Sequence, residues 1–165
     1  MSANTDLVVA IDSQTLVWGI RQQGNDDQNR RAIWLFEQLD SQRAQIIVPT
    51  IVASEYLTHV AKADHAAVLA ELSSRFVLPP FDVRCASLAA ELFRLNKSDT
   101  SKSKPGWRNC LRSDTLIIAT AKIHGARIFY TGDNNCRKVA STIMDACDLP
   151  NQPSNLFGYS ASDED

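Results

Sequence analysis

Residues 112–133 have the sequence RSDTLIIATAKIHGARIFYTGD, which predicts a helix, a turn and a strand. Asp114 stands where we expect the helix to begin, the apolar run 116–123 follows it, and a His-Gly pair has the form of a C-cap. The run 127–130 is rich in β-forming residues. About eleven helical residues span roughly 16 Å, and about six extended residues return roughly 20 Å. We therefore expect Asp114 and Asp133 to lie near each other at one edge of a sheet.

Length and composition predict one domain without a strong global charge. The chain has 165 residues, and we assign residues 1–150 to a single domain. Residues 151–165 are rich in Pro, Asn and Ser and end in acids, so we expect a flexible tail. The net charge of −2 provides no general attraction to nucleic acid, so an anionic partner has to be bound by a local basic patch or a metal.

The cysteines and the apolar runs indicate a cytoplasmic protein. The four cysteines show no C-x-x-C spacing, so we expect free thiols in a reducing cytosol rather than disulfides or a zinc site. The longest apolar runs are too short to span a membrane. Residues 1–6 contain no Lys or Arg, which a secretory signal would have at its start.

Strand-like runs alternate with helical segments along the chain. The strands are expected at 7–11, 45–48, 75–78, 127–130 and 142–147, and the helices at 15–21, 29–39, 50–62, 64–73, 82–95, 114–123 and 134–140. This alternation predicts an α/β fold with a parallel sheet covered by helices on both faces. Functional residues in such folds gather at the carboxyl ends of the strands.

Four acids are expected at that edge. Asp12 directly follows the first strand, and Glu55 lies in the first turns of the helix after the second strand. Together with Asp114 and Asp133, these acids come from separate segments. Each one alone could be a cap, a turn residue or a solvated side chain. Their coincidence at one predicted edge favours a functional site.

Such a cluster favours a divalent cation. Carboxylates a few ångströms apart repel, so some of them have to be protonated or neutralised. Oxygen ligands without His or Cys suit Mg²⁺ or Mn²⁺. A metal bound there can activate water and neutralise charge on a phosphodiester.

A polar segment at 96–109 precedes Asp114. Five cations lie within the sixteen residues 97–112, and all but the last belong to this segment: Lys97, Lys102, Lys104, Arg108 and Arg112. Asp99 is the single acid among these sixteen residues, and Trp107 lies between the lysines and the arginines. The segment could be a phosphate-binding lip with a stacking aromatic, or a flexible solvated loop. Of these cations, we expect Arg112 to reach the acids.

Four segments resemble PIN-domain nucleases, in particular the VapC-type toxins of bacterial toxin–antitoxin pairs. They are LVVAID at 7–12, VPTIVASEYL at 48–57, SDTLIIATA at 113–121 and IFYTGDNN at 128–135. The resemblance implies a three-layer α/β/α sandwich with a mostly parallel five-stranded sheet. It also implies a Mg²⁺- or Mn²⁺-dependent endoribonuclease.

The resemblance further implies roles for individual residues. Asp12, Glu55, Asp114 and Asp133 would be the catalytic and metal-binding acids. Thr131 would orient them through hydrogen bonds, and Asn135 would support them. The implied partners are an RNA substrate, an antitoxin protein and a second copy of the chain. Gln14 stands where such nucleases often have Asn or Ser, and the 96–109 segment is long for the small toxins.

Two other functions fit parts of the sequence. One is a PIN-like module with weak catalysis that only binds RNA or a protein. The other is a haloacid-dehalogenase-like phosphatase, which also begins with an apolar strand ending in Asp. That chemistry needs an acid two residues after the first Asp, where this chain has Gln14.

Overall fold

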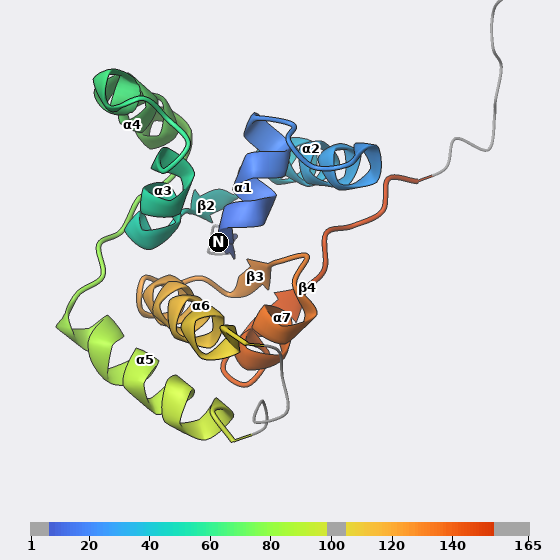
Figure 1. The fold of residues 1–165 in the computed structure, drawn as a ribbon. Helices are drawn as coiled ribbons and strands as arrows, with labels where there is room; N and C mark the ends of the chain where they lie inside the picture. The colour runs from blue at the N-terminus through green and yellow to red at the C-terminus, as the bar shows by residue number, and fades with distance from the viewer. Residues whose placement is uncertain (1–6, 99–104, 154–165) are drawn as a thin grey trace, which may run out of the picture.

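The computed structural model describes residues 7–98 and 105–153 and has a parallel sheet between two layers of helices (Figure 1). The strands are β1 (Val8–Ile11), β2 (Gln45–Ile47), β3 (Ile128–Tyr130) and β4 (Asp145–Cys147). They pair in the order β2-β1-β3-β4, and every pair is parallel. The predicted α/β sandwich with a parallel sheet is therefore confirmed.

The prediction of a fifth strand at residues 75–78 is wrong. The preceding helix extends to Arg75, and Pro79, which has no N–H to donate, follows closely. Only Val77 joins the sheet, through an isolated parallel bridge to Ile47. Its N–H donates to the Ile46 carbonyl at 2.9 Å. The described residues therefore form four strands and a single bridge beside β2.

Helices cover both faces of the sheet. On one face lie α1 (Ser13–Ile20) and α2 (Asp26–Ser41), and on the other lie α5 (Val83–Asn96), α6 (Trp107–Ile123) and α7 (Asn134–Ala140) (Figure 1). Val9 packs with Leu35 and Leu39 of α2 in one cluster. Ala10 and Phe129 belong to the larger cluster that includes α6 and α7. The neighbouring β1 residues Val9 and Ala10 thus lie in different clusters, as expected for side chains on opposite faces of a sheet.

The remaining helices follow β2. They are α3 (Thr50–Leu57), the short 3-10 helix η1 (Lys62–Asp64) and α4 (His65–Arg75). Residues 50–62 were expected to form one helix, but α3 ends at Leu57. Within the described ranges, no helix has both the length and the apolar character needed to cross a bilayer. Most of the expected 151–165 tail falls outside these ranges, so its flexibility stays a prediction.

The start of α6 differs from the prediction. The helix begins at Trp107, not at Asp114, and Gly106 with a φ of 89° precedes it. Trp107 packs against the core and Leu111 is buried, and with Thr115 they form a stripe at intervals of four residues. The exposed residues between them are polar, which gave the segment its loop-like composition. Asp114 therefore lies inside the helix and does not cap it.

Candidate active site

Asp12 is the most buried of the four acids. It follows β1, and its carboxylate caps α1 by accepting a hydrogen bond from the Thr15 N–H at 2.8 Å. Its other oxygen accepts from the hydroxyl of Thr131. Burial raises the pKa of Asp12, hydrogen bonds from Thr131 and Thr15 lower it, and the charge of Asp133 raises it. The net result is a raised pKa, so this carboxylate gains from any cation beside it.

Thr131 connects two of the acids. Its side chain is fully buried after β3, where its N–H donates to the Cys147 carbonyl of the β4 end at 3.0 Å. The hydroxyl donates to Asp12 and accepts from the Asp133 N–H at 3.0 Å. The Asp133 carboxylate then caps α7 by accepting from the backbone N–H groups of Asn135 and Cys136 at 2.6 and 3.0 Å. One hydroxyl thus joins the end of β1 to the start of α7.

Glu55 reaches the site from α3. Its carboxylate accepts hydrogen bonds from the hydroxyls of Ser13 and Ser113, the latter at 2.7 Å. Each serine directly precedes or follows one of the aspartates, since Ser13 follows Asp12 and Ser113 precedes Asp114. Neither serine was predicted to belong to the site. Their adjacency to the aspartates was the available signal, but only the fold shows that they hold Glu55.

Asp114 projects from the middle of α6 toward the other acids. Its pKa is raised to about 7, first by burial and then by the charges of Asp133, Asp12 and Glu55. This mutual influence means that the four predicted acids share one electrostatic environment. The expected proximity of Asp114 and Asp133 therefore holds, although the helix begins earlier than predicted.

The acids are not a tightly packed cage. Among the described residues, a set of three acid, His or Cys ligand atoms all within 4.8 Å of one another occurs elsewhere, at Asp82, Cys85 and His124. No three of the four acids therefore have ligand atoms that all lie this close together. Mg²⁺ characteristically keeps several waters and takes one or two carboxylates directly. A spread of oxygen donors, in which burial raises the pKa of Asp12 and Asp114, fits such a hydrated ion.

Cys136 is the one sulfur beside these acids in the described residues. Its thiol is buried in α7, close enough to Asp114 for each group to influence the pKa of the other. Burial, followed by the charges of Asp114, Asp12 and Asp133, raises the pKa of Cys136 far above its usual range. The group stays a neutral thiol, so the available donors are hard oxygens. These residues fit Mg²⁺ or Mn²⁺ better than a thiophilic metal.

The predicted basic and aromatic residues that the structure describes have contacts away from the acids. Arg112 lies over the ring of Phe93 in α5, with 5.2 Å between the guanidinium carbon and the ring centroid. Trp107 packs against the core, and Arg108 lies 5.7 Å from its ring. Lys102 and Lys104 lie outside the described residues. Asn135 is exposed, and the contact recorded for it comes from its backbone N–H.

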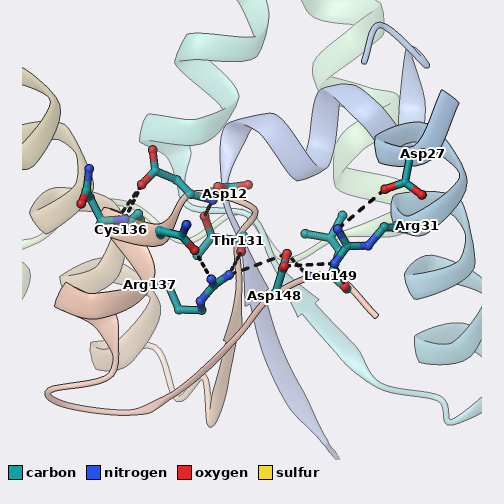
Figure 2. Close-up of polar contacts among 11 residues, drawn as sticks. Asp12, Asp27, Arg31, Thr131, Cys136, Arg137, Asp148 and Leu149 are labelled. Carbon is teal, nitrogen blue, oxygen red and sulfur yellow. Dashed lines mark hydrogen bonds and ion pairs between the residues drawn. The ribbon is translucent and has the colours of Figure 1, made fainter. Parts of the chain in front are cut away.

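A polar network supports the loop that carries Thr131 (Figure 2). Arg137 of α7 donates to the Thr131 carbonyl at 3.2 Å and lies 3.7 Å from Asp148. Asp148 also pairs with Arg31 of α2 at 3.1 Å, and Arg31 donates to the Leu149 carbonyl. The residues after β4 are thereby attached to both helical layers next to the site.

The chain belongs to the PIN domain family, whose model matches residues 9–141. This membership covers all four acids and sets aside the dehalogenase-like alternative. No curated protein matches the sequence.

Solved structures share the fold at low sequence identity. A chain of VapBC2 from Rickettsia felis, bound to a promoter DNA fragment, aligns with a TM-score of 0.60 at 16% identity, covering 87% of this chain and 100% of that one. VapBC-1 from nontypeable Haemophilus influenzae aligns with a TM-score of 0.62 at 9% identity, covering 87% and 98%. FitAcB from Neisseria gonorrhoeae aligns with 0.54 at 19% identity, covering 84% and 95%.

Proposed function

We propose that this PIN-domain protein is a Mg²⁺- or Mn²⁺-dependent endoribonuclease and the toxin of a toxin–antitoxin pair. The observation that carries the nuclease proposal is the electrostatic coupling of Asp114 with Asp133, Asp12 and Glu55 at the carboxyl edge of the sheet. A protein that only bound RNA would gain nothing from these anions, because they repel phosphate. The coupling therefore favours catalysis over the alternative of a binding module.

The residues of the chain have separate tasks in this proposal. The bound metal would supply an activated water and neutralise charge on the scissile phosphate. Asp12, Asp114 and Asp133 would hold that metal, directly or through its waters. Glu55, fixed by Ser13 and Ser113, would orient water on the side of α3. Thr131 would keep Asp12 and Asp133 at a constant separation.

RNA cleavage with matched variants tests the nuclease proposal. We expect wild type to cleave a single-stranded RNA with Mg²⁺ or Mn²⁺ and to stop in excess EDTA. Asp114→Asn should reduce cleavage by at least about 100-fold while the protein stays folded, because the amide keeps the shape and loses the charge. Asp40→Asn, an exposed acid of α2, is the control. Cleavage that persists in EDTA would contradict the metal mechanism, and RNA binding without cleavage would favour the binding module.

The toxin assignment rests on the fold comparison and needs its own test. The solved relatives are complexes named VapBC and FitAcB, so we propose an antitoxin protein as the partner here, acting in the cytoplasm. A homodimer and RNA contacts by Lys102, Lys104, Trp107, Arg108 and Arg112 are further expectations. Expression of wild type should arrest growth, and Asp114→Asn should not. Growth without arrest would remove the toxin role and leave the nuclease proposal intact.

A further inference from the structure

A second cluster of metal-ligating side chains lies where α5 begins and α6 ends. Asp82, Cys85 and His124 each offer one ligand atom, and these atoms all lie within 4.8 Å of one another. His124 is ten residues beyond Asp114, which corresponds to roughly 15 Å along α6. The cluster is therefore separate from the acids of the proposed active site.

Two of the three side chains are placed by the start of α5. Asp82 is the N-cap, and its Oδ1 accepts from the N–H groups of Arg84 and Cys85 at 2.9 and 3.1 Å. Cys85 is fully buried in the first turn, beneath that carboxylate. A helix N-terminus favours negative charge and lowers the cost of forming a thiolate. The cap and the thiol are thus preorganised on the same turn.

His124 supplies the third ligand from a different element. It is the C-cap of α6, and its Nε2 lies 4.0 Å from Asp82 Oδ2. The same nitrogen is 3.1 Å from the Pro80 carbonyl, which holds the ring over the start of α5. The side chains of His124 and Asp82 are 22% and 30% exposed, so an ion can enter from solvent. Metal binding would exchange the Pro80 hydrogen bond for a coordinate bond.

The donor set is that of a thiophilic metal. Zn²⁺ is bound by thiolate, imidazole and carboxylate, commonly with three protein ligands and a water. Mg²⁺ and Mn²⁺ prefer all-oxygen sites. We propose that Asp82, Cys85 and His124 bind one Zn²⁺ ion that clamps the start of α5 to the end of α6. A water completes the coordination.

Arg84 is the competitor for this site. It donates to Asp82 Oδ2 at 2.7 Å and 3.1 Å, and its side chain is 62% exposed. An exposed pair of this kind shifts an equilibrium by no more than about fivefold. Zn²⁺ can therefore displace Arg84, and Arg84→Ala should increase Zn²⁺ affinity by up to about fivefold. A cluster that served only as a hydrogen-bonded cap would gain no metal affinity from this change.

Cobalt absorption provides a direct test on the full chain. Metal-free protein is titrated with Co²⁺, a spectroscopic substitute for Zn²⁺, and the thiolate-to-cobalt charge-transfer absorption is followed. We expect a 1:1 spectrum that Zn²⁺ abolishes. In a separate titration, Zn²⁺ at about 100 times its Kd should raise Tm by about 5 °C or more.

Three cysteine variants decide which sulfur is involved, and a fourth variant tests His124. Cys85→Ser should abolish the charge-transfer absorption. His124→Asn should weaken Zn²⁺ binding at least about tenfold, and it should stay folded because Asn suits a helix C-cap. Cys110→Ser, an exposed cysteine of α6, is the control and should keep the spectrum. Cys136→Ser reports on the acidic site. A spectrum that survives Cys85→Ser and disappears in Cys136→Ser, or the absence of any thiolate absorption in wild type, would overturn the proposal.

Discussion

Among single residues, Asp114 links the electrostatics of the site to the stability of the protein. Its pKa is raised from 3.8 in a model peptide to about 7 in the folded chain. Between these values the folded state binds more protons than the unfolded state. The free energy of unfolding therefore falls as pH rises through this interval, and it levels off above about pH 7.

The first prediction concerns this pH dependence. In EDTA, wild type should lose about 2–4 kcal/mol of stability between pH 4 and pH 7, because Asp114 ionises without a counter-ion. Asp114→Asn should lose less stability than wild type, because it removes the contribution of Asp114 and leaves that of Asp12, whose pKa is also raised, and Mg²⁺ should restore wild type near pH 7. Urea unfolding at several pH values measures all three. Equal slopes for the two proteins in EDTA would show that Asp114 ionises normally.

A second prediction concerns Thr131, whose hydroxyl donates to Asp12 and accepts from the Asp133 N–H. Thr131→Val keeps the shape but leaves the buried carboxylate without that donor. The bond lowers the pKa of Asp12, so its loss should raise that pKa further. We expect destabilisation of about 1–3 kcal/mol. We also expect the pH profile of Mg²⁺-dependent cleavage to shift to higher pH. Thr131→Ser should retain both properties, and an unchanged pH profile in the valine variant would contradict this role.

Among the elements, the segment after β4 depends on an arginine of α2. Arg30 and Arg31 are neighbours, and both lie near Asp27, at 2.7 and 3.9 Å. Only Arg31 also pairs with Asp148 and donates to the Leu149 carbonyl (Figure 2). Its buried Nε has no hydrogen-bond partner among the residues that the structure describes, which offsets part of the gain. The two arginines form a matched pair for measuring this attachment.

The third prediction compares these two arginines. Arg31→Met should lower the free energy of unfolding by about 1–3 kcal/mol, because it removes charged hydrogen bonds to the end of the described chain. Arg30→Met should cost less than about 0.5 kcal/mol, since its pair with Asp27 is exposed. Urea unfolding provides both values. Similar costs would mean that the contacts of Arg31 do not hold the segment after β4.

Across the whole molecule, α1 sets the position of the loop after β3. A Cβ built on Gly132 would lie 2.8 Å from two atoms of the Trp18 indole, which is closer than real contacts allow. Gly132 separates Thr131 from Asp133, so any shift of this loop moves two groups of the site. The close approach of a helix and a loop far apart in sequence thus explains the glycine in Thr-Gly-Asp.

The fourth prediction tests this contact with a rescue. Gly132→Ala should reduce RNA cleavage at least about tenfold, because the loop or the indole has to move. Adding Trp18→Phe should recover much of the activity by freeing space. A Cβ built on Gly24 would lie 2.5 Å from Cδ1, at the other edge of the same indole. Gly24 lies outside the site, so Gly24→Ala should affect stability more than cleavage. If the double variant is no better than Gly132→Ala, strain within the loop is the cause.

Local patterns sufficed for much of this protein. The alternation of strands and helices predicted the parallel sheet, and the carboxyl-edge rule brought four acids together. The C-cap at His124 and Gly125 and the bounds of α7 also agree with the structure. These features depend on periodicity and on hydrogen bonds that span only a few residues. Such interactions are the same in any chain with those residues.

Only the tertiary structure decided the contacts between distant segments. The bond from Thr131 to Asp12 crosses 119 positions, and that from Ser113 to Glu55 crosses 58. The early start of α6 follows from the packing of Trp107 and Leu111 on the core, and Arg112 turns toward Phe93 of α5. The distances between such remote residues depend on how whole elements pack against one another, which no local pattern specifies. The sequence thus determined which acids meet, and the packing of the elements determined what holds them.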